Sequence, residues 1–133
     1  MDKGSYVLLI RVAKEAEVKT RGRSFNILPG YYCYIGSAFN SLSERVKRHL
    51  KKSKKRFWHI DYLLDIGEVL SVLLLPSSVK SEVKISSLFQ KFGEAVDGFG
   101  ASDCQISSNL YKISEEDYFR AIKSVHEYMG VFG

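Results

Sequence analysis

The stretch of sequence that decides the fold covers residues 30–50 and reads GYYCYIGSAFNSLSERVKRHL. Its first part is rich in tyrosine and predicts a strand over residues 31–35, which ends at the turn-forming Gly36. Because side chains alternate between the two faces of a strand, Tyr32, Tyr34 and Gly36 are predicted to share one face. A phenol is therefore expected close to the point where the strand leads into the next element.

The second part of this stretch predicts a basic helix with a defined start. Ser41 and Glu44 fit a capping box, in which Ser41 is the N-cap residue and Glu44 reaches back to it. A stripe at helical spacing is predicted to face the core, namely Leu42, Val46 and Leu50. Arg45 and His49 lie one turn apart beside this stripe, so we expect both at the rim of the cleft that the helix borders.

The rest of the chain predicts further strands and helices around this unit. Residues 6–12 are nearly continuously apolar and predict an interior strand, whereas residues 15–27 are polar around Gly22 and predict a hairpin. The other predicted elements are a helix over 57–64, a buried strand over 69–75, a helix over 79–96, a strand over 110–113 and a helix over 114–128. Consecutive strands joined by glycine turns favour an α+β fold with a small, mostly antiparallel sheet flanked by helices.

Length and composition are those of one soluble domain. The chain has 133 residues, of which 45% are hydrophobic and 26% charged, so we expect a single domain over residues 1–133. With only two cysteines, Cys33 and Cys104, the default location is a reducing cytoplasm. The longest apolar run, residues 72–75, is far too short to cross a membrane.

Positive charge is concentrated in one segment of the chain. The formal net charge is +5, and residues 45–56 hold eight of the twenty Lys and Arg residues with no acid among them. These are Arg45, Lys47, Arg48, Lys51, Lys52, Lys54, Lys55 and Arg56. Such a segment can be a solvated face, but its position beside the tyrosines and His49 favours contact with nucleic acid.

Phosphodiester chemistry needs a group that orients or deprotonates water and groups that stabilise negative charge. Tyr6 and Tyr34 are the candidates for the first task, although a phenol is a poor base unless cations favour the phenolate. Arg45 suits a bidentate grip on a phosphate. His49 is a candidate to bind the phosphate or to protonate the leaving oxygen.

Several motifs carry a resemblance to a known family. They are Gly4-Ser5-Tyr6, Tyr34-Ile35-Gly36 followed by Arg45, the stretch FWHIDY over 57–62 and the loop over 98–104. On these residues the chain resembles the GIY-YIG nuclease superfamily, and in particular its Uri-like free-standing domains. It departs from that pattern in having Ser5 where the motif has isoleucine. The gap between Tyr6 and Tyr34 is also long, which an inserted hairpin over 15–27 would explain.

The resemblance implies further site residues and a cofactor. Such nucleases hold Mg²⁺ (or Mn²⁺) through one glutamate on a later helix, for which Glu82 is the best match and Glu94 a second choice. A late asparagine, here Asn109, tends to lie near the site. Nucleic-acid contacts are expected from the basic segment and the WHIDY stretch, namely Arg48, Lys51, Lys52, Lys54, Lys55, Arg56 and His59. For His59, the alternatives are anchoring its helix to the core or pairing with Asp61. The hairpin tip with Lys19, Arg21 and Arg23 is a second candidate surface.

Taken together, these features predict a metal-dependent endonuclease that hydrolyses phosphodiester bonds in DNA. The alternative is a catalytically inactive nucleic-acid-binding module that uses the same basic helix and tyrosine surface. A third possibility is a protein-interaction domain. DNA is the expected partner and no membrane is involved. Specificity is expected from the domain itself, from a homodimer or from a partner protein.

Overall fold

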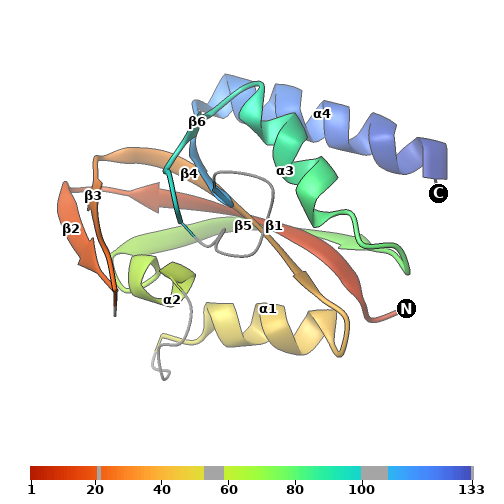
Figure 1. Cartoon of the computed structure of the whole chain (residues 1–133), viewed down its shortest axis with the longest axis horizontal. Coiled ribbons are helices and arrows are strands. Elements are labelled where there is room, and N and C mark those ends of the chain that lie inside the picture. The colour runs from red at the N-terminus through yellow and green to blue at the C-terminus, as the bar shows by residue number, and fades with distance from the viewer. Residues whose placement is uncertain (21, 53–58, 100–107, 133) are drawn as a thin grey trace.

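The computed structural model describes residues 1–20, 22–52, 59–99 and 108–132, with side chains described up to residue 130. In these ranges an antiparallel sheet lies between two helical layers, and a hairpin packs at one end (Figure 1). The strands are β1 (Gly4–Val12), β2 (Ala16–Lys19), β3 (Ser24–Ile27), β4 (Gly30–Ala38), β5 (Gly67–Pro76), β6 (Glu94–Ala95) and β7 (Leu110–Lys112). The helices are α1 (Leu42–Leu50), α2 (His59–Leu63), α3 (Glu82–Gln90) and α4 (Glu115–Phe132). The predicted α+β fold is confirmed.

The main sheet has the strand order β5-β1-β4-β7-β6, and every described pair is antiparallel. β1 pairs with β4 on one side and with β5 on the other, so the predicted interior position of this apolar strand is confirmed. The β1–β4 register places Gly4 opposite Ala38 and Tyr6 opposite Gly36. The start of β1 and the end of β4 therefore lie side by side.

Alternation along β1 and β4 divides the interior into two cores. Tyr6, Leu8, Tyr32 and Tyr34 belong to the core on the α1 and α2 side. On the opposite face, under α3 and α4, lie the alternate residues of the same strands, including Val7, Cys33 and Ile35. The predicted division of β4 between its two faces is confirmed.

The hairpin predicted over 15–27 is confirmed as the two-stranded sheet of β2 and β3. Its apolar side is buried in the first core through Val18, Phe25 and Ile27. This excursion accounts for the long gap between Tyr6 and Tyr34, because the chain returns from it to pair β4 directly with β1.

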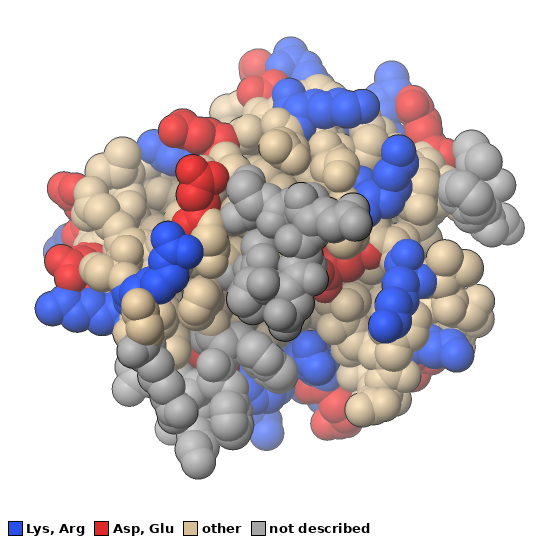
Figure 2. Space-filling view, in the orientation of Figure 1, with Lys and Arg blue, Asp and Glu red and all other residues tan. Residues whose placement is uncertain are grey.

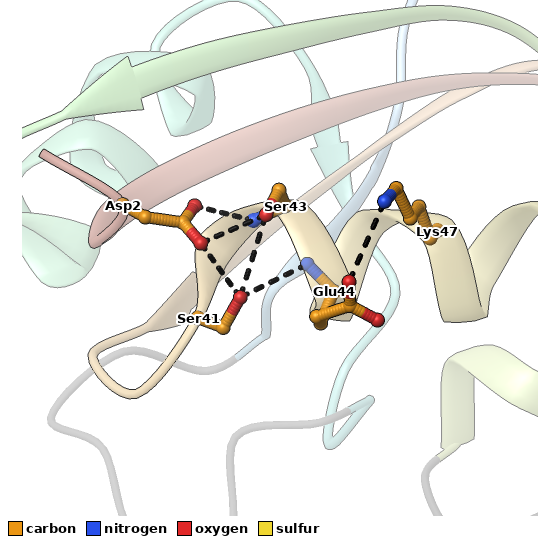
Figure 3. A network of polar contacts seen from close by, with 5 residues as sticks. All are labelled: Asp2, Ser41, Ser43, Glu44 and Lys47. Carbon is orange, nitrogen blue, oxygen red and sulfur yellow. Dashed lines mark hydrogen bonds and ion pairs between the residues drawn. The ribbon is translucent and has the colours of Figure 1, made fainter.

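The start of α1 is confirmed, but its cap differs from the predicted capping box. Ser41 Oγ accepts a hydrogen bond from the Glu44 backbone N–H at 3.2 Å, as predicted for an N-cap. The Glu44 carboxylate instead accepts from Lys47 Nζ at 3.4 Å. Asp2 completes the cap: Oδ1 accepts from the Ser43 N–H at 2.7 Å and Oδ2 from Ser41 Oγ at 2.7 Å (Figure 3). The carboxylate of this cap is therefore supplied by Asp2, which lies outside the local motif.

The inward face of α1 was predicted wrongly at its last position. Leu42 and Val46 are buried, but Leu50 is 51% exposed and His49 is buried. Positions 42, 46 and 49 follow the helical period of 3.6 more closely than 42, 46 and 50 do. His49 is therefore a core residue and not a rim residue.

Three other predictions were wrong, namely where two helices end and how far one strand is buried. The helix predicted over 79–96 covers only Glu82–Gln90, since Gly93 favours a turn and residues 94–95 add β6 to the sheet. The strand predicted as buried over 69–75 is an edge strand, with Leu70 and Leu74 exposed, because only β1 pairs with it in the described sheet. The last helix passes Gly130, where helical backbone needs no left-handed conformation.

None of the described helices has the length and hydropathy that a membrane-spanning segment needs.

Candidate active site

A small cavity opens where the start of β1 and the end of β4 meet α1 and the first turn of α3. Its volume is about 170 Å³, and its lining residues are Tyr6, Tyr34, Gly36, Ser37, Arg45, Glu82 and Asn109. Five of these seven were predicted from the sequence, although they are spread over more than a hundred positions. The fold thus brings together two phenols, a guanidinium, a carboxylate and an amide.

The contact between Tyr6 and Gly36 explains the glycine of the YIG motif. The two residues are cross-strand partners, and the Tyr6 ring lies across the Gly36 backbone. A Cβ at position 36 would overlap the phenol oxygen and ring carbons of Tyr6. Glycine at position 36 therefore leaves room for the Tyr6 ring close to the backbone of β4, and Tyr6 lines the cavity at this point.

The Tyr6 hydroxyl is joined to His49 by a short hydrogen bond. Tyr6 Oη and His49 Nε2 are 2.6 Å apart, and both residues are almost fully buried, with 1% and 2% exposure. His49 lies behind Tyr6 and does not line the small cavity. The imidazole is thus placed to exchange a proton with the phenol and not to bind a phosphate directly.

Burial makes both phenols weak acids. It raises the pKa of Tyr6 well above the ordinary phenol value, and the charge and hydrogen bonding of Arg45 oppose the shift without cancelling it. Burial also raises the pKa of Tyr34, with smaller contributions in the same direction from Tyr6 and Glu82. Both hydroxyls therefore keep their protons at neutral pH. The phenolate that Arg45 was expected to favour does not form in the protein alone.

Arg45 is held at the cavity wall by the backbone of β4. Its Nη1 donates to the Ser37 carbonyl oxygen at 3.1 Å, and the side chain is half-buried. The contact fixes one edge of the guanidinium and orients the group toward the cavity that it lines. A planar, oriented guanidinium is well suited to grip a phosphate.

Glu82, the first residue of α3, is positioned by two neutral donors. Ser37 Oγ donates to Oε1 at 2.9 Å, and Asn109 Nδ2 lies 3.5 Å from Oε2. These contacts orient the carboxylate at the cavity that it lines. Mg²⁺ prefers hard oxygen ligands and often takes only one or two carboxylates, with water and phosphate completing its shell. One oriented carboxylate beside a phosphate-sized cavity fits that ion. The second choice, Glu94, lies on β6 and does not line this cavity.

Several residues predicted to contact nucleic acid lie elsewhere. Arg48 forms a bidentate ion pair with the fully buried Asp61, with both N···O distances 2.9 Å, and so ties α1 to α2. His59 packs between Phe25 and Phe99, with ring centroids 5.5 Å from each. Burial and the nearby Arg23 lower the pKa of His59, which makes it a poor phosphate ligand at neutral pH. The position of His59 therefore agrees with the alternative role, in which it anchors its helix to the core.

Lys51 and Lys52 follow α1 and are exposed, as a phosphate-contacting role requires. Lys54, Lys55, Arg56 and Arg21 lie outside the described residues, as do residues 57–58 and 100–104 of the two motif stretches. Of the hairpin tip, Arg23 packs against Gly98 and over the Phe25 ring, 5.2 Å from its centroid.

Sequence reasoning missed Ser37. Its hydroxyl donates to Glu82 and its carbonyl accepts from Arg45, so one residue orients both charged groups. The available signal was its position directly after Gly36, the glycine of the YIG motif, although β4 continues past the predicted end at Gly36 to Ala38 and includes Ser37. The sequence position of Ser37 alone does not distinguish a residue that orients Glu82 and Arg45 from a serine in an ordinary turn.

The family of the chain follows from its sequence as a whole. The model of the family described as "Domain of unknown function DUF123" matches residues 5–131, so the chain belongs to the DUF123 family. Comparisons with curated proteins and with solved structures give no significant match.

Proposed function

We propose that this protein is a Mg²⁺-dependent endonuclease that hydrolyses phosphodiester bonds in DNA. The observation that carries the proposal is the single cavity lined by Tyr6, Tyr34, Arg45, Glu82 and Asn109. A guanidinium and a carboxylate that line the same small polar cavity suit a phosphate and its counter-ion. The resemblance of the Tyr34-Ile35-Gly36 motif to those of GIY-YIG nucleases supports the same reaction.

The chain's own residues supply a proton path. Tyr6 lies between the cavity and His49, with its hydroxyl 2.6 Å from Nε2. As a water attacks the phosphorus, Tyr6 takes its proton and passes its own to His49. No free phenolate is needed, which agrees with the raised pKa of Tyr6. This path requires the His49 tautomer whose Nε2 carries no proton.

The remaining residues stabilise charge and set geometry. Arg45 grips two oxygens of the scissile phosphate as negative charge develops. Glu82 would hold Mg²⁺, and the ion when bound would neutralise charge on the phosphate and the leaving oxygen. Asn109 and Ser37 keep Glu82 in place. Tyr34 adds a second hydroxyl with which to orient the attacking water.

The test is cleavage of labelled single-stranded, duplex and branched DNA in Mg²⁺ and in EDTA. We expect metal-dependent cutting by the native protein and a loss of about 100-fold or more for Arg45→Ala, the usual cost of removing one charge-stabilising donor. Tyr6→Phe should lose cutting as well, because it removes the proton path and keeps the ring. Lys47→Ala is the matched control, since Lys47 is an exposed cation on the same helix that pairs with Glu44.

Cutting that survives Arg45→Ala would contradict the proposal. Salt-sensitive DNA binding without any cutting would favour the inactive nucleic-acid-binding module instead.

A further inference from the structure

A second, larger cavity adjoins the first and shares Arg45 with it. It has a volume of about 360 Å³, twice that of the small cavity, and is formed by the β4–α1 connection and the outer face of α1. Its walls include Phe39, Asn40, Ser41, Glu44, Arg45 and Arg48. None of its residues other than Arg45 has a part in the proposed chemistry. We propose that this cavity holds one unpaired nucleobase next to the scissile phosphate, stacked on Phe39.

Phe39 is placed to serve as a stacking surface. It follows β4 immediately and is half-buried, so part of its ring borders the cavity. An aromatic ring at a cavity wall beside a phosphate-gripping arginine suits a base, because every base has a face that stacks on aromatic side chains. Asn40 and Glu44 supply hydrogen-bonding groups at the same walls, and a carboxylate can accept from an exocyclic amino group of a base.

The charges around the cavity disfavour a second phosphate there. Glu44 contributes a carboxylate at the rim. The start of α1, where backbone N–H groups would otherwise attract an anion, is occupied by the carboxylate of Asp2, which accepts from Ser43 N–H and Ser41 Oγ (Figure 3). Arg48 has a bidentate contact with Asp61. An aromatic, mixed-polarity cavity of this kind fits a neutral base better than an anion.

A cation beside Phe39 is suitably placed for the strand that carries the base. Lys80 Nζ lies 6.0 Å from the Phe39 ring centroid, and Lys80 is exposed. Lys80 thus reaches over the Phe39 ring from the segment before α3, and Arg45 lines the cavity from α1. These two cations give positive charge near the cavity for the phosphates that neighbour a bound base, which suits single-stranded or locally unpaired DNA.

The inference rests on the proposed function for its choice of DNA, but it can be tested without cleavage. The probe is a short single-stranded oligonucleotide carrying one 2-aminopurine, whose fluorescence falls when the base stacks, titrated with protein in EDTA. Phe39→Ala should weaken binding by about 5- to 150-fold, the range that loss of one base–aromatic stack produces, and should abolish the quenching. Phe39→Trp should restore both. The control is Phe119→Ala, at a 67% exposed phenylalanine on α4, which should change neither.

The outcomes separate this inference from the proposed function. Phe39-dependent quenching with no cleavage in Mg²⁺ would sustain the base subsite while the nuclease proposal fails. Cleavage that is unchanged in KM and kcat by Phe39→Ala, with unchanged quenching, would overturn the subsite alone. Equal weakening by Phe39→Ala and Phe119→Ala, or an absence of binding by the native protein, would also overturn it. Thermal unfolding of each variant is the control that tests whether its fold is intact.

Discussion

At the scale of single residues, the site depends on how closely Tyr6 approaches β4. The ring lies against the backbone of Gly36 and its hydroxyl reaches His49 at 2.6 Å, so the position of the phenol is set by contacts on two sides. A side chain at position 36 has to displace the ring, and with it the proposed proton path.

We expect Gly36→Ala to lower the free energy of unfolding by about 1–3 kcal/mol, as overpacking of a core does, and to abolish cleavage. The control is Gly130→Ala, since a Cβ at that exposed helical position meets no atom within 4 Å. That variant should gain about 0.5–1 kcal/mol, the helix-propensity difference between the two residues. Chemical denaturation of both variants tests the contrast, and equal stabilities would contradict the packing shown here.

Much of the site could be predicted at this scale, and the failures have physical causes. Tyr6, Tyr34 and Arg45 were identified from their residue types and motif positions, whereas Glu82 and Asn109 were implied by the family resemblance, and all five line one cavity. The burial of His49 was missed because an apolar residue, Leu50, competed for the same stripe. The role of Ser37 was missed because it depends on Glu82, forty-five positions away, which only the folded chain brings near.

At the scale of elements, the first residues of the chain and α1 act as one unit. Asp2 accepts hydrogen bonds from Ser41 and Ser43, and the Leu42 N–H donates to the Asp2 carbonyl at 2.9 Å. No local pattern predicts such a cap, since its two halves lie forty positions apart. The early end of α3 is the opposite case, in which a local pattern is present but is not followed. The apolar spacing of α3 continues past Gln90, but residues 94–95 form β6 and pair with β7.

The cap makes a prediction about pH. Hydrogen bonds from Ser41 and Ser43 lower the pKa of Asp2 below its ordinary value of 3.8. The carboxylate therefore stabilises the folded state above about pH 3.8, and this contribution disappears as pH falls through the lower folded pKa. The Tm difference between the native protein and Asp2→Asn should be constant from pH 7 to 5 and shrink below pH 3.8. A difference that does not change with pH would refute the charged cap.

At the scale of the whole molecule, charges of both signs are mixed on the face seen in Figure 2, where Lys and Arg side chains of the described residues are interspersed with acidic ones. Within the basic segment, Arg45 contacts Ser37 and Arg48 contacts Asp61, so these two serve the site and the fold. Lys51 and Lys52 of the same segment are exposed, and we expect them to contact phosphates outside the site.

We expect the double variant Lys51→Ala/Lys52→Ala to reduce the slope of log K against log salt for single-stranded DNA by about 1.4, the contribution of two phosphate contacts. The control is Lys91→Ala/Lys123→Ala, which removes the same charge from exposed positions on the α3 and α4 side. Fluorescence anisotropy at several salt concentrations measures both slopes. An equal reduction in the two variants would show that binding follows net charge and not this segment.

The strand order also has a consequence for how the protein is made. β1 leaves the ribosome before its partners β4 and β5, and the second of these ends at Pro76. At a synthesis rate of about 5–20 residues per second, the edge of β1 that pairs with β5 stays unpaired for roughly 3–13 seconds, until β5 has been made. Asn109, the last of the cavity residues, is made later still. The nascent chain therefore gains its complete cavity only after Asn109 has been made, and until β5 is available the unpaired edge of β1 is prone to aggregation.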